Sequence, residues 1–321
     1  MMKHFLDRLT RAEVDKLTGD FSQLAGVRKL QFCEGPERGM SLLQVHNASG
    51  LHVDFLPDRC LDIGQLWFEG IPLAWLGPNG LPPKERASCF DASLGGLLTT
   101  CGFDHIRQPE EYRGVIFPMH GSMALEPARV TRCETVFTDN TKEIQIEGAI
   151  SSFALKRGGL KLRRRIKVPV LESSISLYDQ IENVGNDPTE ILGMYHFNFG
   201  FPLISETTQV SMLANGDRTS VSLQSEIGIV ALPETEISIQ IANRVGDKVV
   251  KVCLQFHGAD FPILQTFGVL GSTTNLFCLE PATHDRKSRR DLVVSGEIER
   301  TNVNGLVTKH LKVSFSSSGV D

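Results

Sequence analysis

The chain has 321 residues, of which 41% are hydrophobic and 22% charged, a composition that is typical of a globular protein and excludes a disordered one. Its formal net charge of −5 gives no overall attraction to polyphosphate, so nucleic-acid binding would require a strong local basic patch. No window of the sequence approaches the roughly 20 apolar residues that a membrane-spanning helix needs.

The N-terminal segment, MMKHFLDRLTRAEVDK, carries charges throughout and lacks the apolar stretch that a signal peptide needs. Thr10 and Glu13 have the spacing of a capping box, and Gly19 follows the helix-favouring run RAEVDKL. We therefore expect a cytoplasmic protein without a membrane partner, with a short helix at about 11–18.

Farther along the chain, the two-residue period of half-buried strands dominates. Leu51, Val53 and Phe55 alternate with His52 and Asp54, which predicts one strand face in the core and the other in solvent. The same period recurs in later runs, at 144–147, 159–168, 174–184, 235–245, 247–256 and 305–315. Turn-forming residues separate the runs, so the sequence predicts an all-β antiparallel sandwich or barrel. No repeat or linker divides the chain, and we expect a single domain over 1–321.

The run KRGGLKLRRRIK at 156–167 is strongly basic. Its charges alternate with apolar residues and no aromatic side chains are interleaved, which favours a solvated strand face over a nucleic-acid site. Leu160, Leu162, Ile166 and Val168 share the predicted apolar face. We therefore expect no nucleic-acid partner.

The cysteines are odd in number and never form a Cys-x-x-Cys arrangement; they stand at 33, 60, 89, 101, 133, 253 and 278. This pattern argues against a disulfide framework and a thiolate metal site, and it predicts buried thiols. Cys101, in TTCGFDH, is either a reactive thiol or a packing residue, and the packing role is favoured because only His105 could stabilise a thiolate there. Without a metal-ligand or phosphate-loop spacing either, we expect no metal and no cofactor.

His120 stands in FPMHGS, with Pro118 two residues before it and Gly121 immediately after, a pattern typical of a constrained turn. Such a histidine either bonds the local backbone or belongs to a functional site. Ser122 is not a nucleophile of the hydrolase kind, because the Gly-x-Ser-x-Gly frame is absent.

In MYHFNFGFP, at 194–202, His196 and Asn198 lie two residues apart and so share one face of a predicted strand. The other face would be aromatic, with Tyr195, Phe197, Phe199 and Phe201. A polar pair amid so much apolar bulk either satisfies itself internally or lines a pocket.

Glu280, in LFCLEPATH at 276–284, follows an apolar run and precedes a proline. A carboxylate at the end of a buried strand is costly unless it is paired or functional, and desolvation would make it a better base. A glutamate in a surface loop is the alternative interpretation.

The segment IENVGNDPTEILGMYHFNFG, at 181–200, resembles the galactose mutarotase-like superfamily, and LEPAT at 279–283 looks like the segment that supplies that family's catalytic carboxylate. His120, His196 and Glu280 also follow the family's order. More closely, the chain is similar over nearly its whole length to the DUF4432-type branch of aldose 1-epimerase-related proteins. The motifs that carry this likeness are LPDRCLDIG at 56–64, IPLAWLGPNG at 71–80, GGLLTTCGFDH at 95–105 and HGSMALEPAR at 120–129.

The resemblance implies a large antiparallel β-supersandwich with few short helices, and the activity of an aldose 1-epimerase (mutarotase) acting on a monosaccharide or sugar derivative without metal. Glu280 would be the base on the anomeric hydroxyl, His196 would protonate the ring oxygen, and His120 would bond the sugar near that oxygen. Arg59, Asp104 and Asn198 would bind hydroxyls.

The resemblance leaves several points open. Arg59 could instead be a structural partner of Asp58 or Asp62, and Ser122 stands where the branch usually has arginine, which bears on specificity. A sugar isomerase or epimerase acting at another carbon and a non-catalytic carbohydrate-binding protein are the alternative functions. Retention of both His196 and Glu280 favours an enzyme. The sequence leaves the oligomeric state open, and a homodimer is one possibility.

Overall fold

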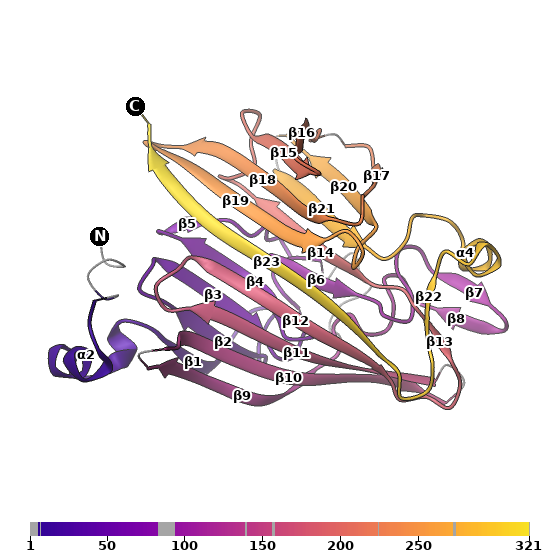
Figure 1. Cartoon of the computed structure of the whole chain (residues 1–321), viewed down its shortest axis with the longest axis horizontal. Coiled ribbons are helices and arrows are strands. Elements are labelled where there is room, and N and C mark those ends of the chain that lie inside the picture. Colours follow the sequence, from indigo (N-terminus) through magenta and orange to yellow (C-terminus); the bar gives the residue numbers. More distant parts are fainter. Residues whose placement is uncertain are drawn as a thin grey trace.

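The computed structural model in Figure 1 describes residues 6, 8–82, 94–138, 140–155, 158–223, 225–271 and 274–320. The predicted N-terminal helix is confirmed as α2 (Arg11–Leu17), with both hydrogen bonds of the capping box formed between Thr10 and Glu13. A 3-10 turn, η1 (Phe21–Gln23), follows it, and α4 (Arg289–Ser295) lies near the C-terminus. No helix in the described part of the chain is both long and apolar enough to cross a membrane.

The largest sheet has nine antiparallel strands in the order β16-β15-β18-β19-β23-β12-β11-β10-β9. It contains all the later runs in which the sequence shows a two-residue period, so those strand predictions are confirmed. Its strands are β9 (Ala128–Phe137), β10 (Lys142–Ala154), β11 (Gly158–Pro169), β12 (Ser174–Asn183), β15 (Gln209–Ala214), β16 (Asp217–Ser220), β18 (Glu236–Val245), β19 (Lys248–His257) and β23 (Leu306–Gly319).

Two five-stranded sheets supply the other layer. The N-terminal one, in the order β1 to β5, consists of β1 (Gly26–Gln31), β2 (Ser41–His46), β3 (Leu51–Leu56), β4 (Asp62–Phe68) and β5 (Ile71–Pro72). The other, in the order β17-β20-β21-β14-β6, consists of β6 (Leu98–Cys101), β14 (Met194–Gly200), β17 (Gly228–Ala231), β20 (Ile263–Val269) and β21 (Leu276–Ala282). Two small ladders complete the fold: β7 (Glu110–Tyr112) with β8 (Val115–Phe117), and β13 (Thr189–Ile191) with β22 (Glu299–Thr301).

Backbone hydrogen bonds join the two five-stranded sheets edge to edge. The amide of Trp75 donates to the carbonyl of Asn198 at 3.0 Å, and the amide of Gly200 donates to that of Leu73 at 3.0 Å. The main hydrophobic core lies between this combined layer and the nine-stranded sheet, because buried side chains of all three sheets belong to one cluster. Figure 1 shows β23 running diagonally across the nine-stranded sheet, with the N-terminal strands in the layer behind it.

Arg164 is the one charged residue of β11 that lies on its core side, at 1% exposure. Its guanidinium reaches Asp62 at 2.6 Å and Asp179 at 2.7 Å, and it also donates to the hydroxyl of Thr100 at 2.8 Å. The hydroxyl of Tyr195 donates to Asp179. This buried network connects β4, β6, β11, β12 and β14. Through Tyr195 it fixes the core side of β14, the strand that also carries His196.

The structure corrects three expectations. Asp54 is buried rather than in solvent, because the pairing of β3 with β4 shifts register beside it. Phe201 lies beyond the end of β14 and is 66% exposed, so it does not extend the aromatic face. Among the cysteines, Cys33 is exposed while 133 and 253 are partly buried; 60, 101 and 278 are buried as predicted, and 89 lies outside the described residues.

Candidate active site

One row of polar side chains crosses the sheet that contains β14. The register pairs His196 with Thr99 on β6, and it pairs Glu280 with Gln265 on β20. Because Phe197 pairs with Leu279, His196 stands beside Glu280 in the same antiparallel ladder. The aromatic neighbours of His196 on β14 point into the core, so the row lies on the opposite face of the sheet, as the two-residue period predicts.

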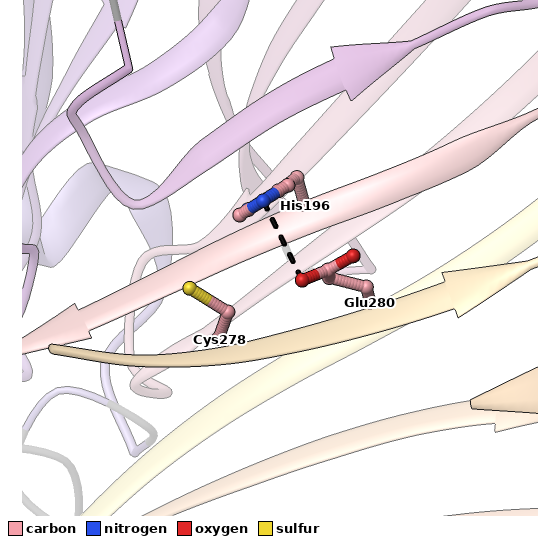
Figure 2. Close-up of side chains that lie close together, drawn as sticks. All are labelled: His196, Cys278 and Glu280. Atoms are coloured by element: carbon pink, nitrogen blue, oxygen red, sulfur yellow. Dashed lines mark ion pairs between the residues drawn. The ribbon is translucent and has the colours of Figure 1, made fainter. Parts of the chain in front are cut away.

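His196 and Glu280 point toward each other from β14 and β21, as Figure 2 shows. The His196 Nε2 atom lies 3.5 Å from Oε1 of Glu280, and the two side chains are 9% and 2% exposed. This separation is longer than a hydrogen bond, which is usual for an acid–base pair before substrate is bound. The other ring nitrogen of His196, Nδ1, is buried without a hydrogen-bond partner in the described part of the protein, an uncommon condition in a protein interior.

Gln265 holds the second oxygen of Glu280. The Gln265 side-chain amide donates to Oε2 of Glu280, while its carbonyl oxygen accepts from Arg107 Nε at 3.0 Å and from Arg286 Nη1 at 3.0 Å. Two guanidinium donors on that oxygen fix which end of the amide faces Glu280. Oε2 of Glu280 is therefore bound within the protein, and Oε1 faces His196.

His120 occupies the turn between β8 and β9 that the sequence predicts, with φ of 57°. Gly121 follows at φ 78°, and a Cβ atom there would lie 2.3 Å from the carbonyl oxygen of His105, so glycine is required. The His120 ring stands edge-on to that of His196, with centroids 5.9 Å apart. The three predicted catalytic side chains are thus brought together.

The tautomer of His120 follows from its backbone contact. The Arg107 amide donates to Nδ1 of His120 at 3.3 Å, so the proton of a neutral ring lies on Nε2. Burial, and then the positive charges of His196 and Arg107, lower the pKa of His120 well below its usual value. His120 is therefore a neutral imidazole that donates from Nε2.

Cys278 is a third potential ligand beside the pair, and Figure 2 shows it next to Glu280. In the region that the structure describes, ligand atoms of His196, Cys278 and Glu280 all lie within 4.8 Å of one another. A zinc-like ion would need Cys278 as thiolate. Burial and then the charge of Glu280 raise the pKa of this thiol well above its usual value, and its Sγ lies 3.5 Å from the side-chain oxygen of Asn198. These contacts make the arrangement a poor metal site.

Asn198 lies in the row's face, fully buried, and both ends of its side chain contact protein atoms. Its nitrogen donates to the carbonyl of Gly96 at 3.1 Å and to that of His196 at 3.3 Å, and its oxygen faces Cys278. These contacts indicate that Asn198 orients its neighbours in the row, while its predicted binding of a sugar hydroxyl stays a prediction.

The contacts described for Arg59 and Asp104 are with residues outside the row. Arg59 is 2% exposed in the turn between β3 and β4; burial lowers its pKa to about 10, while the charge of Asp62 and then that of Glu37 oppose this effect. The nearby Asp62 favours the structural interpretation of Arg59.

Asp104 accepts hydrogen bonds from Ser122, from its amide at 2.8 Å and from its hydroxyl at 2.6 Å. Ser122, the departure from the branch pattern, thus serves as the donor to Asp104. Roles of Arg59 and Asp104 in binding sugar stay predictions.

Sequence reasoning missed Gln265, Arg107, Arg286 and Cys278 as members of the site. A signal existed for two of them. Gln265 is a lone amide in the apolar run FPILQTFGVL, and Cys278 lies two residues before Glu280 and so on the same strand face. Nothing local distinguishes the two arginines, since both stand in loops without a strand period.

The comparisons with known proteins agree with this architecture. A family model described as a domain of unknown function (DUF4432) matches residues 37–228, and no curated protein matches the chain. A candidate aldose 1-epimerase from Klebsiella pneumoniae subsp. pneumoniae is 17% identical with a TM-score of 0.70, covering 90% of this chain and 83% of its own. A galactose 1-epimerase from Lactobacillus acidophilus NCFM is 12% identical with a TM-score of 0.61, covering 92% and 99%. An aldose epimerase homologue from C. elegans is 11% identical with a TM-score of 0.59, covering 88% and 100%.

At these identities the likeness establishes the fold, which is the antiparallel supersandwich of the galactose mutarotase type. The expected fold class is confirmed, and the family model that matches is the expected one.

Proposed function

The chain belongs to the DUF4432 family, and on that premise we propose that it is a carbohydrate epimerase, an aldose 1-epimerase that interconverts sugar anomers by acid–base ring opening. The observation that carries the proposal is the buried pair of His196 and Glu280, with 3.5 Å between Nε2 and Oε1. The imidazole and the carboxylate face each other, and one carboxylate oxygen has no hydrogen bond from Gln265. Such a pair can act as general acid and general base on one substrate. The mutarotase-type fold is shared with solved structures named as epimerases, which adds fold-level support.

In the proposed reaction, Oε1 of Glu280 removes the proton of the anomeric hydroxyl while Nε2 of His196 gives a proton to the ring oxygen. The bond between C1 and the ring oxygen breaks, and a carbonyl forms at C1. Rotation about C1–C2 presents the other face of the carbonyl, and the two proton transfers then reverse as the ring closes. His120, which donates from Nε2, would bind a sugar oxygen near the reacting bond and stabilise negative charge that develops there.

Saturation-transfer NMR between anomer signals tests the proposal, because it reports exchange without a net reaction. The panel contains neutral aldoses, deoxy sugars, uronates, sugar phosphates and ketoses, each with the wild-type protein and with the Glu280→Gln variant. We expect at least one aldose to exchange faster with wild-type protein than with either the variant or buffer alone.

Three other outcomes would redirect the assignment. Ligand line broadening without faster exchange would favour the carbohydrate-binding alternative. Incorporation of solvent deuterium at a ring carbon would favour epimerisation at another carbon. No effect on any sugar would reject the proposed enzyme class.

A further inference from the structure

A cavity of about 230 Å³ lies beside the proposed active site, between the loop at 105–110 and the segment at 284–289. Four cationic side chains line it: Arg107, Arg286, Lys287 and Arg289. The only carboxylate in its lining is Glu110, whose two oxygens accept from the backbone amide of Arg289. The cavity therefore has a strong excess of positive side chains.

Two of these cations are neutralised within the protein. Lys287 pairs with Glu297 at 2.6 Å and lies 3.4 Å from Asp285, and Arg289 pairs with Glu190 at 3.2 Å. Arg107 and Arg286 form no ion pair with a carboxylate anywhere in the described ranges. In the described part of the cavity lining, the two cations without a direct ion pair are thus these arginines, and Glu280 and Asp285 attract Arg107 only at longer range.

The two arginines converge on a single neutral atom. Each guanidinium lies 3.0 Å from Oε1 of Gln265, so the two donor nitrogens are at most 6.0 Å apart. Burial, and then the charge of Arg286, lower the pKa of Arg107 to about 10. Arg107 is held in this position because it also donates to the backbone carbonyls of His284 and Asp285. Two like charges fixed this close together favour an anion between or beside them.

A further buried donor in the cavity lining lacks a partner. Arg289 is 2% exposed, and its Nε atom is buried without a hydrogen bond in the described structure. Arginine stays protonated in proteins, so this Nε–H is an unmet donor of a charged group. This Nε atom is enclosed by protein atoms, so Arg289 contributes charge to the lining but not an accessible donor.

Gln265 connects this cavity to the reacting pair. Its oxygen binds the two arginines of the cavity, and its nitrogen binds Oε2 of Glu280. A sugar whose anomeric carbon lies between His196 and Glu280 can therefore extend a substituent across Gln265 to Arg286, which is the exposed one of the two arginines.

We propose that the natural substrate is an aldose with an acidic substituent, a phosphate or a carboxylate, and that this cavity binds the acidic group through Arg286, beside the charge of Arg107. The proposal rests on the proposed epimerase function for the sugar ring, whereas the anion site stands on the cavity itself. Phosphate and carboxylate share the oxyanion chemistry that arginine donors recognise.

The first experiment compares anomer exchange of glucose, glucose 6-phosphate and glucuronate. We expect kcat/KM to be about tenfold or more higher for one of the acidic sugars, because hydrogen bonds to charged groups add about that much discrimination. In Arg286→Gln, the ratio of acidic to neutral kcat/KM should fall by a similar factor. Arg290→Gln, which alters the exposed neighbouring arginine outside the cavity lining, should keep the wild-type ratio.

Inorganic phosphate separates the anion site from the enzyme assignment. We expect it to bind wild-type protein in calorimetry, to bind Arg286→Gln at least about tenfold more weakly, and to inhibit exchange of the acidic sugar competitively. Exchange of neutral and acidic sugars with equal kcat/KM would overturn the inference and leave the epimerase function standing. If no sugar exchanges, the proposed epimerase function is wrong. In that case, phosphate that binds the wild type but not Arg286→Gln would still support the anion site. Absence of phosphate binding to the wild type would reject the anion site.

Discussion

Arg107 and His120 exchange hydrogen bonds through their backbones: the His120 amide donates to the carbonyl of Arg107 at 2.8 Å, while the Arg107 amide donates to Nδ1 of the His120 ring at 3.3 Å. The segment that carries Arg107 therefore sets both the position and the tautomer of His120. Its guanidinium also reaches Gln265 and, through it, the carboxylate of Glu280.

This relationship predicts that His120→Gln retains more activity than His120→Asn. Glutamine can place a donor where Nε2 stands, whereas asparagine reaches only the position of Nδ1. We expect kcat of His120→Asn to fall by about 10²-fold, the usual effect of a lost donor to developing charge. Asparagine tolerates the positive φ at this position better than glutamine does, so a stability effect alone would rank the two variants the other way. Thermal unfolding of both variants provides that control.

Glu280→Gln should lower kcat by about 10²- to 10⁴-fold, because glutamine keeps the bond to Gln265 but cannot accept the anomeric proton. His196→Asn should also lower kcat, and the double variant should lose less than the two single losses combined, since each transfer depends on the other. Glu236→Gln, at the exposed start of β18, is the matched control. Near-normal exchange in both folded single variants would disprove the acid–base assignment.

His284 predicts a pH dependence of stability. Burial, and then the charge of Arg107, lower its pKa to about 3. The unfolded chain, with a histidine pKa near 6.5, therefore binds the proton first, so this residue's contribution is present above about pH 6.5 and is lost as pH falls toward 3. Within that window the loss is up to about 1.4 kcal/mol per pH unit.

Asp54 acts with the opposite sign, because burial raises its pKa to about 6 and its contribution is lost as pH rises to that value. The measurement is therefore the difference in unfolding free energy between wild type and His284→Gln, from pH 7.5 to 5 in a phosphate-free buffer. The advantage of the wild type should shrink as pH falls below 6.5. A difference that stays constant would contradict the assigned protonation of His284.

Arg164→Met should destabilise the fold by about 3–5 kcal/mol, because it leaves Asp62 and Asp179 buried without their cation. The neighbouring Arg165→Met is the control, since Arg165 is 57% exposed and its pair with Glu147 is a surface ion pair worth about 1 kcal/mol or less. Denaturant unfolding measures both. Equal effects of the two substitutions would mean that the network is not a main support of the fold.

Chelation by EDTA should leave anomer exchange unchanged, because the thiol of Cys278 is protonated and Gln265 occupies Oε2 of Glu280. Zinc should inhibit only at high concentration, because His196, Cys278 and Glu280 lie close together but the Cys278 thiol must first lose its proton. Cys278→Ala should reduce that inhibition. Loss of activity with EDTA, restored by a divalent ion, would instead assign a metal-dependent isomerase.

The strands were predictable because a two-residue period directly reports one buried face, as in β11 and β23. Exceptions came from contacts that the period does not encode. Arg164 sits on an apolar face because two carboxylates from other strands meet it, and Asp54 is buried because the ladder shifts register beside it. Asp179 is the cross-strand partner of Arg164 in the next strand, whereas Asp62 is about a hundred residues away.

The sequence pointed to candidate site residues that stand in distinctive local patterns, and it did not point to those that reach the site through long-range contacts. The turn around His120 and the alternation around His196 are visible in the chain itself. Arg107 and Arg286 become members of the site only through Gln265, more than a hundred residues from Arg107 in the chain. Only the folded chain makes that connection.

The row of Thr99, His196, Glu280 and Gln265 is completed late in synthesis, because β6 and β14 emerge from the ribosome well before β20 and β21. An incomplete product that ends before β20 carries the histidines but no carboxylate opposite them. Since pairing of strands distant in sequence is slow, formation of the pair should be among the late steps of folding. Recovery of activity after refolding would then report completion of the whole sheet. Incomplete chains would have no catalytic activity.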